Sequence, residues 1–158
     1  MNYWLMKSEP ENYSIDDLVA EPNQTDYWDG IRNYQVRNFF RDTMKVGDLA
    51  FFYHSNCPVP GIVGTMRIVS EAYTDHTAFD PNEKYYDPKS DPDNPRWLMV
   101  DVQLISKFPG IISLAEMRNN PELEQMRVLR RGNRLSVTPV SPEEWEHILK
   151  LSEKSADS

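Results

Sequence analysis

Two pairs of residues in this sequence place a base beside a nucleophile. His54 is followed directly by Ser55, and Cys57 lies a few positions further on. A histidine that activates a hydroxyl or thiol must lie within hydrogen-bond reach of it, and adjacency along the chain does not supply that geometry. The G-x-S-x-G motif of many hydrolases is also absent. Hydrolysis is therefore disfavoured, and no catalytic residue is predicted.

Trp28 suggests a different chemistry, because it stands in a turn between another aromatic residue and an Asp-Gly pair. Recognition of an extruded nucleic-acid base requires an aromatic face for stacking and polar groups for the edge of the base. Lys7-Ser8 supplies donors at the end of the first expected strand, and Asn33 and His54 supply mixed donor and acceptor groups. These residues form a candidate base-binding site.

Each of these residues also has a purely structural interpretation. Trp28 fits a hydrophobic core as well as a binding site. Lys7, Asn33 and His54 are equally suited to hydrogen-bonding backbone groups at the ends of strands. The residue types alone do not decide between the two interpretations.

Positive charge is concentrated in two segments of an acidic chain whose net charge is −8. Residues 32–45 hold four basic residues and one acid, and residues 127–134 hold four arginines and no acid. Arg37 and Arg41 are spaced i, i+4 and would share one face of a helix. We expect these two residues and Arg134 to contact phosphates, the alternative for either segment being a solvated face. The overall acidity argues against a general nucleic-acid coat protein.

The composition predicts one globular domain over residues 1–158, with a frayed tail from about residue 152. A single cysteine excludes an intrachain disulfide framework, and three scattered histidines lack metal-ligand spacing. No apolar run is long enough for a membrane span, and no secretory signal is visible. We therefore expect a cytoplasmic protein without a metal, a cofactor or a membrane partner.

The apolar patterns predict five strands, at residues 2–6, 49–53, 61–71, 96–108 and 134–140. Helix-capping patterns predict helices that begin near residues 14, 33, 113 and 141, and a further short helix at residues 123–129. The segment 21–26 is expected to be a loop, and so is the long segment 72–95. This order favours a mixed, largely antiparallel sheet curled into a barrel with short helices around it, an α+β fold.

Several motifs together resemble the EVE domain family, in particular its small single-domain members of the thymocyte nuclear protein type. They lie at residues 3–10 (YWLMKSEP), 28–38 (WDGIRNYQVRN), 47–56 (GDLAFFYHSN), 60–64 (PGIVG), 78–81 (AFDP), 85–90 (YYDPKS), 95–97 (PRW) and 132–137 (GNRLSV). The resemblance implies a PUA-like fold with a curled sheet of five to six strands, related to YTH and ASCH domains. It also implies binding of nucleic acid that carries a modified base, such as a methylated cytosine or adenine, in an aromatic-lined pocket.

The resemblance assigns ligand-binding positions by their place in these motifs. They are Lys7, Ser8 and Trp28 in the pocket wall, Asp29, Arg32, Asn33, Tyr53, His54 and Ser55 in the most specific motifs, and Tyr85 and Tyr86 in a loop that closes the pocket. The function predicted is a non-enzymatic module that binds a modified base of DNA or RNA. A binder or enzyme that uses the same pocket for a small molecule or a free modified nucleoside is the alternative.

Overall fold

The five apolar segments expected to be strands all form strands in the computed structural model, which describes residues 1–156. They are β1 (Tyr3–Ser8), β3 (Leu49–His54), β4 (Gly61–Ile68), β6 (Leu98–Ser113) and β7 (Val137–Val140). Two further strands, β2 (Thr25–Trp28) and β5 (Tyr73–Thr74), bring the sheet to seven. The first two residues of β2 were expected to be loop because they are polar and the last two to be a turn, and β5 is too short to give a pattern.

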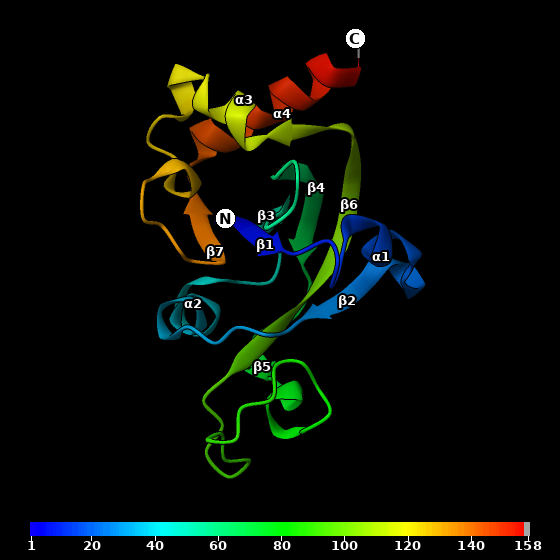
Figure 1. The fold of residues 1–158 in the computed structure, drawn as a ribbon, viewed down its shortest axis with the longest axis vertical. Helices are drawn as coiled ribbons and strands as arrows, with labels where there is room; N and C mark the ends of the chain where they lie inside the picture. The colour runs from blue at the N-terminus through cyan, green and yellow to red at the C-terminus, as the bar shows by residue number, and fades with distance from the viewer. Residues whose placement is uncertain (157–158) are drawn as a thin grey trace.

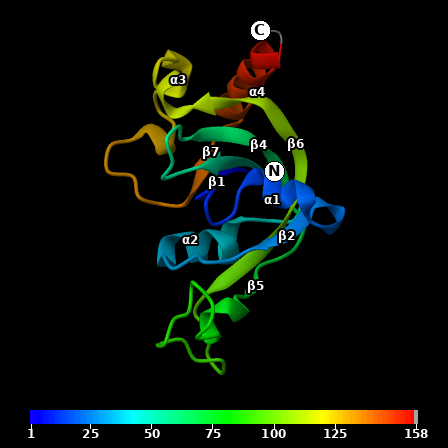
Figure 2. The same cartoon turned by 45° about the vertical axis from the view of Figure 1, so that its right-hand side comes forward.

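The strands form one curled sheet in the order β2-β6-β4-β3-β1-β7, and β5 is added to β6 (Figures 1 and 2). β1 and β3 are parallel, whereas the other strand pairs are antiparallel. Within the described residues β2 and β7 are not paired with each other, so the sheet curls like a barrel without closing. The predicted mixed, curled α+β fold is confirmed, with one or two strands more than expected.

The central strands are buried on both faces, which explains their continuous apolar sequences. Successive side chains of a strand point to opposite faces. Met6 and Phe52 therefore enter one hydrophobic core, and Leu5 and Phe51 enter a second one. Burial on both faces makes β1 and β3 the rigid centre of the molecule, and the polar residues that follow them are held in fixed positions.

Four short helices cover the sheet: α1 (Ile15–Ala20), α2 (Tyr34–Asn38), α3 (Leu114–Arg118) and α4 (Pro142–Ala156). The predicted caps of all four are present, because each cap side chain accepts a hydrogen bond from a backbone N–H three residues later. α2 continues directly into a π-helical turn, Phe39–Thr43. Its residues pack on the first core, whereas α4 packs on the second.

One expectation about the helices near the C-terminus is wrong. The helix expected at residues 123–129 is instead two 3-10 turns, Pro121–Leu123 and Arg127–Leu129, because Met126 between them adopts an extended backbone. The final helix, α4, extends to Ala156, and the frayed tail expected from about residue 152 stays a prediction. Beyond it, residues 157–158 lie outside the described part of the chain.

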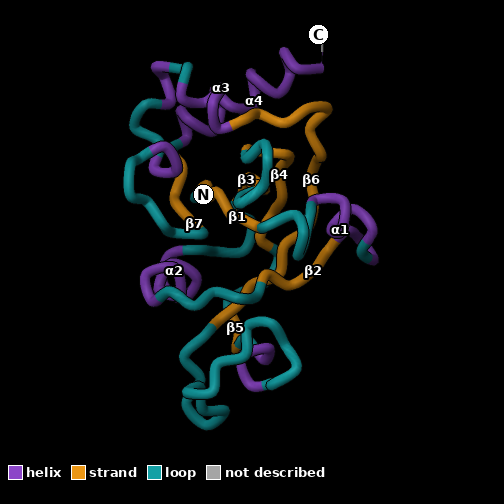
Figure 3. Tube along the Cα trace, in the orientation of Figure 1, coloured by secondary structure: helices purple, strands orange, loops and turns teal. Residues whose placement is uncertain are grey.

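The long loop between β5 and β6 is packed onto the body, as its aromatic residues predicted (teal in Figure 3). After a 3-10 turn (His76–Phe79), the Asp87 backbone N–H donates to the Ala78 carbonyl at 2.9 Å. The Asp87 carboxylate accepts a hydrogen bond from the Trp97 indole at 2.7 Å. These contacts fold the loop on itself, and hydrogen bonds from Arg32 to the Tyr85 carbonyl attach it to the segment that follows β2.

Candidate functional site

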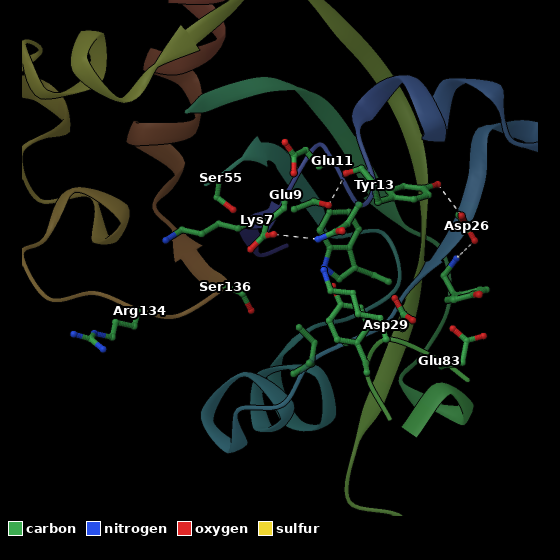
Figure 4. A pocket seen from close by; sticks show the side chains of 18 residues that line it. Lys7, Glu9, Glu11, Tyr13, Asp26, Asp29, Ser55, Glu83, Arg134 and Ser136 are labelled. Atoms are coloured by element: carbon green, nitrogen blue, oxygen red, sulfur yellow. Dashed lines mark hydrogen bonds between the residues drawn. The ribbon is translucent and has the colours of Figure 1, made fainter. Parts of the chain in front are cut away.

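A cavity of about 680 Å³ lies where the barrel is not closed (Figure 4). Its walls come from the ends of β1 and β2, the loop after β5 and the segment that precedes β7. The lining residues are Lys7, Ser8, Glu9, Glu11, Asn12, Tyr13, Asp26, Tyr27, Trp28, Asp29, Gly30, Ile31, Ser55, Glu83, Lys84, Tyr85, Arg134 and Ser136. Its volume falls in the range of about 300–1,000 Å³ that is usual for ligand pockets.

The parallel pairing of β1 and β3 brings two distant motifs together at one end of the cavity. In this register Lys7 pairs with Tyr53 and Ser8 with His54. The Ser55 backbone N–H then donates to the Ser8 carbonyl at 3.0 Å. Lys7 and Ser55 therefore line the same wall although they are far apart in the sequence.

Trp28 is both a core residue and part of the cavity wall. It is 7% exposed, and its ring meets the Phe52 ring edge to face with the centroids 5.2 Å apart. Its pairing with Val100 of β6 anchors the last residue of β2. The two interpretations of Trp28 are therefore compatible, because one part of the residue packs inside while another borders the cavity.

A buried ion pair fixes the turn that follows Trp28. Asp75 is fully buried and accepts hydrogen bonds from the Gly30 backbone N–H and the Arg32 guanidinium, both at 3.0 Å. Arg32 also donates twice to the Tyr85 carbonyl, at 3.0 and 2.5 Å. Burial alone would raise the pKa of Asp75, but hydrogen bonds from Thr77, Arg32 and Gly30 outweigh it and lower that pKa.

The Tyr85 ring is packed directly against Gly30. Gly30 has a φ of +81°, and a Cβ there would lie 2.7 Å from the Tyr85 ring. Glycine satisfies both demands, because it adopts positive φ freely and leaves room for the ring. The Arg32–Asp75 pair and the Gly30 contact together hold Tyr85 as a wall of the cavity.

Charged residues of both signs line the cavity (Figure 4). Lys7 and Arg134 lie on one side, where Glu9 lies beside Lys7, and Asp26, Asp29 and Glu83 lie on the other. Burial lowers the pKa of the Lys7 ammonium. The pKa of Asp29 is raised by burial and by the negative charge of Asp75. A ligand with one anionic and one hydrogen-bond-donating end would match this arrangement.

A comparison with protein families identifies the family to which the chain belongs. The family model described as EVE domain matches residues 2–151. This chain belongs to the EVE domain family. Human thymocyte nuclear protein 1 is 48% identical to it over 169 residues, covering 97% of this chain and 75% of the human protein. Rat thymocyte nuclear protein 1 is 51% identical, covering 96% of this chain and 74% of the rat protein.

Solved structures of EVE domain relatives have the same fold. One is the human THYN1 protein in complex with 5-methylcytosine-containing DNA. It has a TM-score of 0.90 and 49% identity, with 97% of this chain and 98% of that chain covered. A Pseudomonas syringae protein, PSPTO5229, has a TM-score of 0.90 at 46% identity, with 95% and 99% covered. The Mmi1 YTH domain, at a TM-score of 0.55 and 12% identity, shares the fold alone.

The expected cytoplasmic location is contradicted by these comparisons. The relatives called thymocyte nuclear protein 1 are named as nuclear proteins, and the human one was crystallised with DNA. The absence of a secretory signal had not distinguished between compartments inside the cell. The structure adds that no helix in residues 1–156 is long and apolar enough to cross a membrane.

The cavity brings together about half of the site residues expected from the sequence of this EVE domain. The predicted residues that line it are Lys7, Ser8, Trp28, Asp29, Ser55, Tyr85 and Arg134. The predicted residues that lie outside its lining are Arg32, Asn33, Arg37, Arg41, Tyr53, His54 and Tyr86. Most residues of the second group have another structural task.

His54 and Asn33 satisfy backbone groups. The His54 Nε2 atom accepts a hydrogen bond from the Ile15 backbone N–H at 3.1 Å, and the Asn33 side chain accepts one from Val36 at 3.1 Å. Burial lowers the pKa of His54 and outweighs the opposing charge of Asp16, which favours the neutral ring that the bond needs. Because this nitrogen is occupied, it is not poised to deprotonate Ser55 or a neighbouring thiol.

The two remaining aromatic positions differ in exposure. Tyr53 is 3% exposed and packs in the second core, with the Lys7 ammonium 5.9 Å from its ring centre. Tyr86 is 41% exposed and lies outside the lining that its neighbour Tyr85 forms. Of the two adjacent tyrosines, only Tyr85 therefore borders the cavity.

The three arginines expected to contact phosphates differ in their partners. Arg41 forms an exposed ion pair with Asp42 at 2.8 Å. Arg37 donates to neutral oxygens, the Asn38 side chain at 2.9 Å and the Arg96 carbonyl at 3.3 Å. Within the described residues the Arg134 guanidinium has no hydrogen-bond or ion-pair partner, and it borders the cavity.

Sequence reasoning missed an acidic and aromatic part of the cavity. The missed residues are Glu9, Glu11, Asn12, Tyr13, Asp26, Tyr27, Gly30, Ile31, Glu83, Lys84 and Ser136. Tyr13 donates to Asp26 at 2.7 Å, which ties the segment after β1 to β2. The Tyr27-Trp28 pair was the available signal, since β2 as a strand would have placed Asp26 and Tyr27 beside Trp28.

Proposed function

We propose that this chain is a non-enzymatic DNA-binding module that holds a methylated base, 5-methylcytosine above all, in the cavity beside Trp28. The observation that carries the proposal is a cavity walled by Trp28 and Tyr85 in a fold shared with a relative crystallised on 5-methylcytosine-containing DNA. The volume leaves ample room for an extruded base. Lys7 and Arg134 supply positive charge at one side, where the phosphates of the same strand would lie.

A free modified nucleoside is the second candidate ligand. The net charge of −8 and the carboxylates at the cavity favour a ligand with few phosphates. The two candidates differ in their response to salt, because each phosphate neutralised on duplex DNA contributes about −0.9 to the slope of log K against log salt. Binding of a nucleoside should show almost no slope.

Trp28 provides the direct test of the proposed site. Loss of stacking on an aromatic residue costs about 1–3 kcal/mol per base. The Trp28→Ala variant should therefore bind 5-methylcytosine DNA about 5- to 150-fold more weakly. Because Trp28 is buried, the same change should also destabilise the fold by about 3–5 kcal/mol. Trp28→Phe should retain more of the binding affinity and more of the stability than Trp28→Ala does.

A matched control separates loss of stability from loss of stacking. Trp145 is also buried, at 4% exposure, but it stacks on Phe51 in the second core, away from the cavity. Trp145→Phe should lower the melting temperature and leave the affinity of the folded protein unchanged. If the Trp28 variants melt early but bind the methylated oligonucleotide normally, Trp28 is core only, and this cavity is not the base site.

A further inference from the structure

The carboxylates around the cavity differ in how far their oxygens are already used. Asp26 accepts hydrogen bonds from the Tyr13 hydroxyl at 2.7 Å and the Tyr27 backbone N–H at 2.8 Å. Glu9 accepts one from Asn12 at 3.0 Å. Asp29 is half-buried and directly follows Trp28. Asp26 is thus occupied on both oxygens. Asp29 interacts with the Thr77 side chain and with its own backbone, and it borders the cavity beside the indole.

The position of Asp29 is fixed by its surroundings. The next residue, Gly30, is tied to Asp75 through its backbone and is covered by the Tyr85 ring. Burial and the charge of Asp75 raise the pKa of Asp29, and hydrogen bonding to Thr77 and its own backbone offsets only part of this. A hydrogen-bond donor from a ligand would stabilise the charged form further, because an ionised carboxylate only accepts hydrogen bonds.

We infer that Asp29 accepts a hydrogen bond from the exocyclic amino group of the bound base, so that the cavity selects amino-bearing bases over keto bases. The inference rests on the proposed function and names the class of base. Cytosine presents a donor at N4, whereas thymine presents an acceptor, O4, at the same position. Thymine carries the same C5-methyl group as 5-methylcytosine, so a cavity that sensed the methyl group alone would accept both.

The positions of Lys7 and Arg134 support this orientation. These two cations attract the phosphates, and the edge of the base is then directed toward Asp29 on the opposite side. There, thymine O4 would face the Asp29 carboxylate with no hydrogen between two acceptors. A well-placed hydrogen bond to a base edge discriminates by about 1–3 kcal/mol, which corresponds to a ratio of about 5 to 150 in affinity.

The test compares bases that differ only at their edge. Duplexes should carry 5-methylcytosine, cytosine, thymine or uracil at one position opposite an abasic site, so that no base pair has to be broken in any of them. Fluorescence anisotropy gives each dissociation constant. The wild-type protein should prefer 5-methylcytosine to thymine by about 5- to 150-fold, and cytosine to uracil in the same direction.

Asp29→Asn should bring the ratio of 5-methylcytosine to thymine close to one, because an amide can either accept from N4 or donate to O4. Asp26→Asn is the matched control, because it removes the same charge at the same cavity. It should change all four affinities by a common factor and preserve the ratio. Thermal melting of both variants establishes that they are folded.

The outcomes separate this inference from the proposed function. Equal wild-type affinity for 5-methylcytosine and thymine, or an unchanged ratio in Asp29→Asn, overturns the role of Asp29 while base binding beside Trp28 stands. Equal affinity for all four bases and for a duplex with a second abasic site in their place overturns the base site itself, and the inference with it. The wild-type ratios alone already test the inference, independently of any variant.

Discussion

Gly30→Ala tests whether the Tyr85 wall is held in place as the structure indicates. The first effect of the change is backbone strain, because Gly30 has a φ of +81°. A residue with a Cβ in the left-handed region costs about 1–2 kcal/mol. For a domain of this size 1 kcal/mol corresponds to about 2–4 °C, so strain alone should lower the melting temperature by about 2–8 °C.

The second effect is a steric clash with Tyr85. The new Cβ would lie 2.7 Å from the ring, whereas ordinary contact begins at 3.4 Å, so the ring must move by about 0.7 Å. Overpacking of this kind costs about a further 1–3 kcal/mol. Because Arg32 holds the Tyr85 carbonyl through two hydrogen bonds, the ring rather than the backbone should give way. Affinity for the methylated oligonucleotide should then fall together with stability.

Gly47→Ala is the control for strain. Gly47 has a φ of +95°, no heavy atom lies within 4 Å of the place that a Cβ would occupy, and the residue is outside the cavity lining. The variant should lose only the stability that corresponds to backbone strain, and its affinity for the methylated oligonucleotide should be unchanged. Thermal melting and anisotropy on both variants give the two effects separately.

A double-mutant cycle isolates the contact between residues 30 and 85. In a Tyr85→Ala background, Gly30→Ala should cost no more than Gly47→Ala does, because the ring that it displaces is gone. A coupling energy of about 1–3 kcal/mol is expected. A coupling near zero, with Gly30→Ala binding as tightly as the wild type, would refute the view that Gly30 and Tyr85 form one wall of the cavity.

Two further predictions concern Arg134, which borders the cavity, and His54, which lies outside its lining. Arg134→Ala should reduce the salt slope of DNA binding by about one unit, and Arg41→Ala should change it less, because Asp42 already neutralises Arg41; equal changes would contradict this distinction. The pKa of His54 is lower in the folded protein than its ordinary value of 6.5, so its contribution to stability is complete above about pH 6.5 and is lost as the pH falls through the folded-state pKa. In the His54→Gln variant the amide oxygen can still accept from the Ile15 backbone N–H. The melting temperature of this variant should depend less on pH between about pH 5 and 7, and base discrimination should be unchanged. A pH dependence parallel to that of the wild type would rule out His54 as the titrating group.

Features that depend on local sequence were predictable. The apolar run of β3 indicated a strand buried on both faces, and the caps of the four helices follow from residue types at fixed spacing. Trp28 was predicted as a site residue because it is an aromatic in a turn, and Lys7 because it ends an apolar strand; both line the cavity. The curled sheet follows from the same pattern of strands and short helices.

Features that depend on long-range pairing were not predictable from these patterns. The sequence shows Arg32 beside other basic residues, but its partner Asp75 lies 43 positions away, and only the fold reveals that this arginine positions Tyr85. β2 was missed because a polar edge strand has little apolar signal. Because β2 was not predicted, the acidic residues on that side of the cavity, including Asp26, were not predicted to line it.

The acidity of the chain is consistent with selective binding of DNA. A net charge of −8 repels a polyanion, and local attraction comes from the cavity side that holds Lys7 and Arg134, next to the arginine-rich segment 127–134. Few phosphate contacts give weak binding to arbitrary sequence, because that binding is almost entirely electrostatic. On the proposed function, stacking on Trp28 and the hydrogen bond to Asp29 must then supply most of the useful free energy. On this proposal the protein should dissociate readily from unmodified DNA and remain bound where a methylated base enters the cavity.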